Sequence, residues 1–107
     1  MHLNHQEFVT ALTNKKKIML IFFSKEDGTN LGRSCAPMDF GPSRRAKDQT
    51  DRYHFWDFDS DQKNHVLSLL PNQVVKMELF DESFDPAEFI NWSPIRWFLS
   101  RDWGQYS

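Results

Sequence analysis

The 107-residue sequence has one cysteine, few glycines and no long apolar run. Because Cys35 has no second cysteine to pair with, an internal disulfide is excluded, and a reducing compartment is the simplest expectation. Four glycines and five prolines are too few for a flexible linker or a fibrous repeat. The longest apolar run, Ile18 to Phe23, is too short to span a bilayer but suits a buried strand. The sequence does not open with a cationic segment followed by an apolar one, so we expect no signal peptide, no membrane contact and a cytoplasmic location.

An excess of one charge is also missing. Thirteen basic and fifteen acidic residues give a net charge of −2, which excludes a basic surface that would follow a nucleic-acid backbone across the whole molecule. The charges are nevertheless uneven, because residues 1–53 carry +3 and residues 54–107 carry −5. The abundant class is aromatic, at 15% of the residues. Length and composition therefore predict one small domain with an aromatic-rich core.

The first expected element is a short helix. Asn4 stands at its N-cap and Glu7 at the capping-box position three residues later. Phe8, Ala11 and Leu12 share one helical face, which we expect to be buried. The helix should end near residue 14, before a run of three lysines.

Five short strands are expected to follow. Asp27-Gly28 predicts a hairpin turn between the first two, Pro37 closes the second, and residues 38–51 form a long loop without periodicity. Two later start signals, at 85–86 and 93–94, predict short helical turns. The expected strands cover residues 17–24, 31–36, 52–58, 65–69 and 74–80.

This order of elements predicts the fold class. We expect a mainly β (α+β) protein, a small and strongly bent antiparallel five-stranded barrel of the Sm/SH3-like type with an N-terminal helix and C-terminal helical turns. The whole chain, 1–107, is read as one domain. It divides into a helix (1–15), a barrel (16–81) and a helical C-terminal extension (82–107).

The most basic region predicts a ligand-binding surface. Arg44 and Arg45 lie in the long loop, and we expect them to join Arg33, Arg52 and Tyr53 in recognising a nucleotide or another nucleic-acid-type anion. Arginine binds phosphate with a planar fork of donors, and an aromatic ring can stack on a base. The alternative is a solvated loop whose charges pair locally with neighbouring aspartates.

A second group of residues indicates metal binding or hydrolysis. His54 and His65 lie on neighbouring expected strands, and Asp57 lies close to His54 in the sequence. The alternative is a structural pair of histidines. Neither the spacing of these residues nor the Asp-x-Asp-x-Asp segment from Asp57 to Asp61 matches a known metal motif, so no cofactor and no catalytic residue are assigned.

The C-terminal tryptophans give a third candidate site. A domain this small cannot easily bury every aromatic ring, and tryptophan is enriched where proteins meet. Trp92, Trp97 and Trp103 are therefore candidates for a surface that binds a protein partner or a second copy of the chain. Packing into the core is the alternative.

Residues 9–89 also resemble a known family, the WYL domain. The matching features are an Arg and a Pro at the end of the second strand, an aromatic strand, an Asp after it and a Phe-Asp-Pro ending; in this sequence they are Arg33, Pro37, Tyr53-His54-Phe55, Asp59 and Phe84-Asp85-Pro86. The resemblance implies a bent Sm/SH3-like barrel and a regulatory sensor that binds a nucleic-acid-type or other negatively charged ligand.

These observations give three expected functions. The first is a non-enzymatic regulatory or ligand-sensing module that recognises a nucleotide or a similar anion. The second is a protein-interaction module that uses the tryptophan-rich C-terminus, and the third is a small metal-binding or hydrolytic protein.

Overall fold

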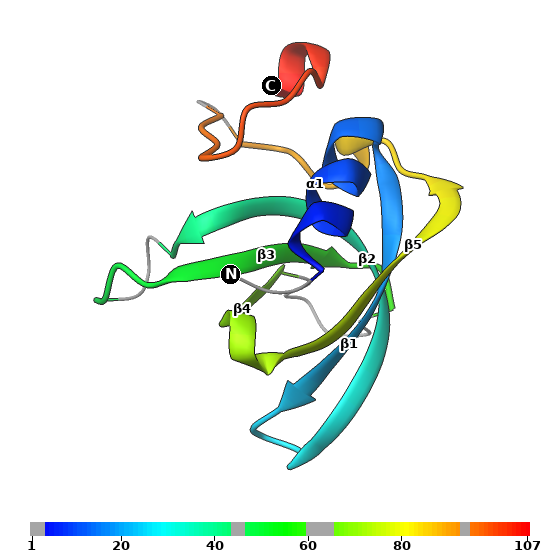
Figure 1. Ribbon diagram of the computed structural model, residues 1–107. Helices are drawn as coiled ribbons and strands as arrows, with labels where there is room; N and C mark the ends of the chain where they lie inside the picture. Colours follow the sequence, from blue (N-terminus) through cyan, green and yellow to red (C-terminus); the bar gives the residue numbers. More distant parts are fainter. Residues whose placement is uncertain (1–3, 44–46, 60–65, 93–94) are drawn as a thin grey trace.

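The computed structural model describes residues 4–43, 47–59, 66–92 and 95–107. Within these residues there are one α-helix, five strands and three single-turn 3₁₀ helices, and the strands form one antiparallel sheet in the order β4-β3-β2-β1-β5 (Figure 1). The predicted fold class, a small mainly β protein with a bent five-stranded sheet and an N-terminal helix, is confirmed. The elements are α1 (His5–Asn14), β1 (Lys16–Ser24), β2 (Thr29–Pro42), β3 (Asp51–Asp57), β4 (Val66–Leu69), η1 (Pro71–Gln73), β5 (Val74–Ser83), η2 (Pro86–Glu88) and η3 (Gly104–Tyr106).

Strand β2 joins the two halves of the sheet. Its first part, up to Cys35, pairs with β1, and its second part, from Cys35 onward, pairs with β3, so the strand curves from one side of the molecule to the other (Figure 1). The predicted end of this strand at Pro37 is wrong. The pairing of β2 with β3 shifts register between Pro37 and Asp39, and such an irregularity tolerates a residue that has no N–H to donate. Residues 38–42 of the expected 38–51 loop therefore belong to β2.

Helix α1 supplies one wall of the core. Phe8, Ala11 and Leu12 are buried, as their spacing predicted. The ring of Phe8 lies edge-on to Tyr53 and Phe55, at centroid distances of 4.9 and 5.4 Å. Edge-to-face aromatic pairs of this kind contribute about 0.5–1.5 kcal/mol beyond the burial of their area. The helix thus closes the barrel by packing onto the aromatic side of β3.

The start of α1 differs from the prediction. Asn4 precedes the helix, but its side chain makes no capping hydrogen bond. Its Oδ1 atom instead accepts from the backbone N–H of Met77, at 3.3 Å. Met77 lies on β5, which is an edge strand of the sheet, so Asn4 ties the beginning of the helix to that edge.

The C-terminal segment contains less helix than expected. The start signal at Asp85 is confirmed, because its side chain caps η2 by accepting from the N–H of Ala87. The second signal, at 93–94, lies outside the described residues. The helical turn predicted for 95–99 is absent, because residues 95–97 have no regular structure and 98–99 form a bend. We call residues 95–107 the C-terminal strap.

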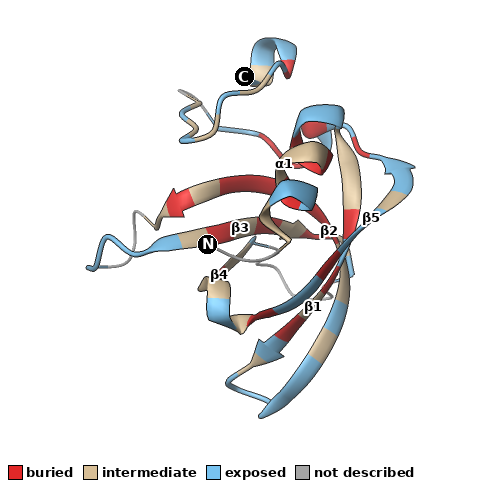
Figure 2. Ribbon diagram, in the orientation of Figure 1, coloured by how far each residue is buried: buried red, intermediate tan, exposed pale blue. Residues whose placement is uncertain are grey.

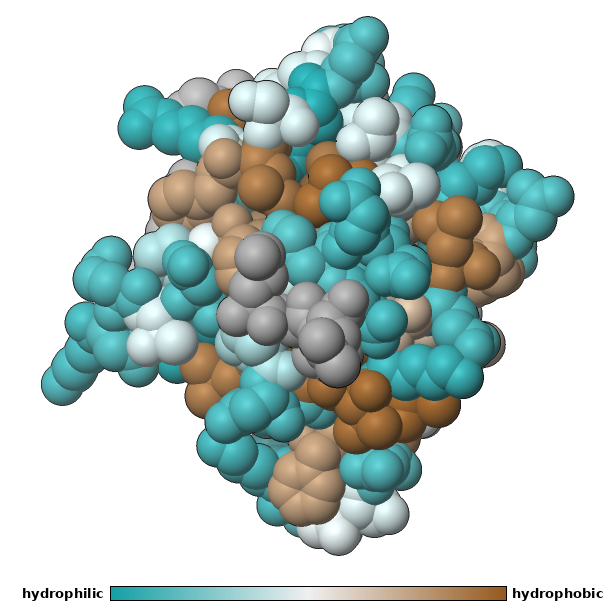
Figure 3. All heavy atoms as spheres, viewed as in Figure 1, coloured by the Kyte–Doolittle hydropathy of each residue, from teal (hydrophilic) through white to brown (hydrophobic). Residues whose placement is uncertain are grey.

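The strap lies against the barrel, and Trp103 within it is buried. The other buried positions follow mainly α1 and the middle of β2 and β3 (Figure 2). On the face shown in Figure 3, apolar surface is broken into separate patches by hydrophilic residues. In the part of the chain that the structure describes, no helix is both long and apolar enough to cross a membrane.

Candidate ligand-binding site

The structure does not bring together the described members of the predicted basic surface. Arg33 and Gly41 lie eight residues apart on β2, and Gly41 pairs with Arg52. Eight residues of extended strand cover up to about 25 Å. Arg44 and Arg45 lie outside the described residues, and Tyr53 is fully buried in the core.

The two described arginines of that surface have local partners. Arg33 pairs with the buried carboxylate of Asp57, with Nε and Oδ2 3.3 Å apart. Arg52 pairs with Asp48, with Nη2 and Oδ2 3.2 Å apart. The pKa of Asp48 is lowered, chiefly by a hydrogen bond from the backbone N–H of Thr50 and further by Arg52. These contacts agree with local pairing of the charges.

Tyr53 contributes to stability. Its hydroxyl lies 2.7 Å from Nδ1 of His5, so a polar contact joins α1 to β3 at the end of the aromatic core. Burial, and then the positive charge of the N-terminus, lower the pKa of His5. The pair anchors the helix and leaves Tyr53 no exposed surface.

The histidine–aspartate group is also divided. His54 and Asp57 are three residues apart on β3, and successive side chains of a strand point to opposite faces. His65 lies outside the described residues. Among the residues that are described, no three His, Cys, Asp or Glu side chains come together as metal ligands.

His54 instead belongs to a pocket that sequence reasoning missed. This pocket has a volume of about 510 Å³ and lies between the sheet and the C-terminal segment. Three rings from the C-terminal segment form one wall, while β2, β3 and β4 supply apolar and hydrogen-bonding groups. The lining residues used below are Met38, Asp39, His54, Ser68, Trp92, Arg96, Trp97 and Phe98.

The carboxylate of Asp39 holds the strap against this pocket. Its Oδ2 atom accepts from the backbone N–H of Phe98 at 2.9 Å, and its Oδ1 atom accepts from the N–H of Leu99 at 3.0 Å. Oδ1 also accepts from Nη2 of Arg101 at 3.2 Å. The predicted helical turn at 95–99 is absent because these two amides bind Asp39 instead of continuing a helix.

Arg101 completes the attachment. Its side chain is fully buried, and the guanidinium lies over the rings of Trp97 and Trp103, 4.1 and 4.5 Å from their centroids. It also donates to the backbone carbonyls of Met38 and Leu99. Burial lowers the pKa of Arg101 to about 10, against the opposing effect of Asp39. The guanidinium therefore stays charged at neutral pH, and the contact with Asp39 is a buried ion pair.

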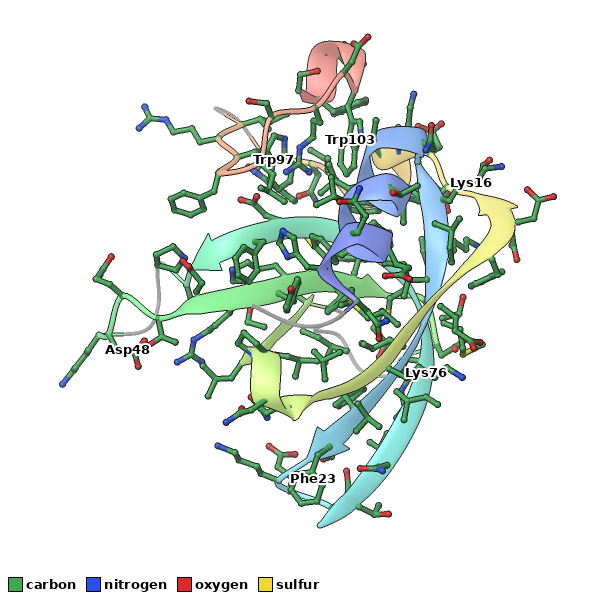
Figure 4. All side chains as sticks on the ribbon, in the orientation of Figure 1. Lys16, Phe23, Asp48, Lys76, Trp97 and Trp103 are labelled. Atoms are coloured by element: carbon green, nitrogen blue, oxygen red, sulfur yellow. The ribbon has the colours of Figure 1, made fainter. Side chains whose placement is uncertain are left out.

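The three predicted interface tryptophans have different environments. Trp103 is buried, and its Nε1 donates to the carbonyl of Leu12 at the end of α1, 2.8 Å away (Figure 4). The Nε1 of Trp97 donates to the carbonyl of Tyr106 within the strap, at 2.9 Å. Trp92 is 38% exposed, with its ring 6.0 Å from that of Trp97. Of the three, Trp92 is the most exposed, Trp97 is partly buried and Trp103 is buried.

Phe98 is the most exposed ring at the pocket, at 56%. It lies directly against Gly41 of β2, and a Cβ atom added at Gly41 would overlap its ring. Gly41 therefore leaves the room that Phe98 needs to lie over the strand. Its carbonyl meanwhile accepts from Nε2 of His54, at 2.9 Å.

Comparisons with protein-family models, with curated proteins and with solved structures found no match. The resemblance to the WYL domain accordingly stays a prediction.

Proposed function

We propose that this chain is a non-enzymatic ligand-binding module of a regulatory kind. Its ligand is a small molecule with a flat ring and an anionic group, for which a nucleotide is the model. The observation that carries the proposal is the pocket between the strap and the sheet. Its volume of about 510 Å³ falls within the usual range for small-molecule sites, and its walls combine aromatic rings with a few polar groups.

The rings favour a flat ligand. Phe98 and Trp92 keep much of their surface exposed at the pocket, although apolar rings of this size are usually buried. A base stacked on an aromatic side chain gains about 1–3 kcal/mol. A flat ligand would therefore cover surface that the folded chain leaves in water.

The charges favour an anion of low charge. The negative charge of Asp39 is offset by its ion pair with Arg101, so it repels an anionic group only weakly. Arg96 adds a positive charge at the exposed wall of the pocket. Ser68 also lines the pocket, and its hydroxyl is a polar group there that can accept a further hydrogen bond from a ligand.

The same groups support binding rather than catalysis. Both oxygens of Asp39 already accept hydrogen bonds. Both ring nitrogens of His54 are engaged, Nδ1 with the hydroxyl of Ser68 at 2.8 Å and Nε2 with the carbonyl of Gly41. A general base needs a lone pair directed at a substrate proton, and neither side chain offers one in this arrangement.

Titration with AMP, followed by backbone amide shifts, tests the proposal. Adenosine supplies the ring alone and inorganic phosphate the anion alone. We expect AMP at low salt to shift the amides of Ser68 and Phe98, adenosine to do so more weakly, and phosphate to have little effect. Absence of shifts at millimolar AMP would refute the proposal, as would shifts confined to residues 47–52.

Two glycines of β2 provide a matched pair of variants. Gly41→Ala forces the ring of Phe98 to move, whereas an added Cβ at Gly32 meets no atom within 4 Å. Gly41→Ala should weaken AMP binding about tenfold, the size expected for one lost stacking contact. Gly32→Ala should leave binding unchanged.

A second candidate function is a protein-interaction surface, which the exposure of Trp92 and Phe98 favours. Light scattering over a range of protein concentrations should then show self-association that Phe98→Ala abolishes. Val75→Ala is the control, because Val75 is a similarly exposed apolar residue on β5 that does not line the pocket. A monomer at all concentrations would remove the version in which the chain binds a second copy of itself.

A further inference from the structure

We propose that the strap and the ligand site are coupled, so that a bound ligand holds the strap on the barrel and release of the strap opens the site. The latch is the buried ion pair between Asp39 and Arg101. This inference rests on the proposed function, because it describes how the same pocket is regulated.

The first support is that the strap is a wall of the pocket. Arg96, Trp97 and Phe98 all belong to the strap, and all three line the cavity. The opposite wall comes from the sheet, with Met38 and His54 among its residues. A ligand that contacts both walls binds the docked strap better than the released one, and this differential affinity is what couples the two events.

The second support is that one latch governs the placement of those wall residues. Asp39 receives the N–H groups of Phe98 and Leu99 and the guanidinium of Arg101. Arg101 in turn lies over the rings of both Trp97 and Trp103. Loss of either member of the pair leaves a buried charge without its partner, so the contacts should form and break together.

The third support is the chemistry of the latch. Release of the strap returns both charged groups to water, and this hydration compensates for much of the attraction that is lost. The ion pair by itself therefore favours docking only modestly, while the burial of Trp103 also holds the strap in place. A ligand at moderate concentration can shift such an equilibrium.

The size of the shift follows from linkage. A ligand that binds only the docked form stabilises that form by a factor of one plus the ratio of its concentration to its dissociation constant. At one hundred times the dissociation constant, the docked form is favoured about 100-fold more than in the free protein. Exchange of amide hydrogens that are protected only by docking should slow by the same factor.

Hydrogen exchange with AMP as the probe tests the coupling. The reporters are the amides of Phe98 and Leu99, which donate to Asp39, and the reference is the amide of Gly28, which donates to Ser24 in the distant β1–β2 turn. We expect saturating AMP to slow exchange at Phe98 and Leu99 by about 100-fold and to leave Gly28 unchanged. Equal exchange with and without AMP, in a protein that binds AMP, would overturn the inference.

Variants of the latch provide the reciprocal measurement. Arg101→Lys keeps the charge but loses the planar fork that lies over the two tryptophan rings, and it should speed exchange at Phe98 and Leu99. Its affinity for AMP should fall in proportion to the docked fraction that is lost. Asp39→Asn is the second variant if Arg101→Lys does not fold. Lys16→Gln is the control, because it removes an ion pair with the exposed Asp81.

The outcomes separate the two proposals. If the natural sequence does not bind AMP, the proposed function fails and the coupling fails with it. If it binds AMP, and the latch variants expose the strap amides but bind AMP as tightly as before, the proposed function survives and the coupling alone is refuted.

Discussion

Replacement of Asp39 should destabilise the protein far more than replacement of any exposed carboxylate. Asp39→Ala removes the acceptor for two backbone amides and the ionic partner of a fully buried guanidinium. Removal of one member of a buried ion pair typically costs about 3–5 kcal/mol. Charge-assisted hydrogen bonds to the two amides would add about 1.5–3 kcal/mol each if the strap had to stay in place.

The strap does not have to stay in place, and this limits the loss. Once the accumulated cost exceeds the free energy of docking, the strap leaves the barrel and Arg101 returns to water. We therefore expect Asp39→Ala to lower the free energy of unfolding by about 3 kcal/mol, the lower end of the range for a broken buried pair. Arg101→Ala should have a similar effect, because it releases the same strap.

The double variant gives the decisive comparison. If either single change releases the strap, the double variant Asp39→Ala/Arg101→Ala should have a free energy of unfolding only slightly lower than that of either single variant. The interaction energy of the cycle should then be about 2–3 kcal/mol, the upper end for residues that share one network. Urea unfolding followed by far-ultraviolet circular dichroism measures the barrel, and tryptophan fluorescence follows the strap.

Additive effects of the two changes would refute this reasoning. So would a loss for Asp39→Ala as small as that for Asp81→Ala, whose side chain is almost fully exposed in its pair with Lys16. Either result would mean that the ion pair does not govern docking of the strap.

Three further predictions concern the core. Phe8→Ala should lower the free energy of unfolding in urea by about 3–5 kcal/mol, since it leaves a cavity beside two aromatic rings. The pKa of His5 is lowered in the folded chain from its ordinary value of 6.5. Below about pH 6.5 the unfolded chain therefore binds more protons than the folded chain, and the free energy of unfolding should decrease as the pH is lowered. His5→Gln should flatten this dependence in urea titrations between about pH 7 and pH 5. Burial, and then the charge of Asp57, raise the pKa of the Cys35 thiol, so labelling by a thiol-reactive disulfide should be at least about 100-fold slower in the native protein than in urea. Rapid native labelling would contradict the buried position of Cys35.

Local signals in the sequence predicted most of the elements. The turn at Asp27-Gly28 is present, with Gly28 at a φ of 65° that few other residues accept. The apolar face of α1 and the capped turn after Asp85 were also predicted correctly. Each of these features depends on residues within a few positions of one another, which is why one sequence suffices to find them.

The course of β2 could not be predicted in the same way. Residues 35–39 are buried without interruption, so the alternation that identifies a half-buried strand is lost there. The cause lies in the tertiary structure, because α1 packs against β2 and the strap binds Met38 and Asp39 at the end of this stretch. Pro37 then predicted the end of the strand, but the register shift beside it allows the strand to continue.

The candidate site depends on still longer-range contacts. Asp39 and Arg101 are 62 residues apart, and no motif links them. His54 was a candidate because histidine is a common metal ligand and catalytic residue. Its contacts with Ser68 and Gly41 do not support either role. Phe98 was not among the predicted site residues, and nothing in the sequence indicates that Gly41 makes room for its ring. A pocket formed between a strand and a strap that is far away in the sequence produces no periodic pattern from which it could be predicted.

The hydrogen bond between Asn4 and Met77 has a consequence for how molecules of this protein meet one another. An edge strand of ten residues, such as β5, presents backbone donors and acceptors that a strand from another molecule can join. The side chain of Asn4 occupies the outward N–H in the middle of that edge, and the pairing of β1 with β5 is irregular at two places. Asn4 therefore caps no helix and instead occupies one of the backbone donors that edge-to-edge pairing would need.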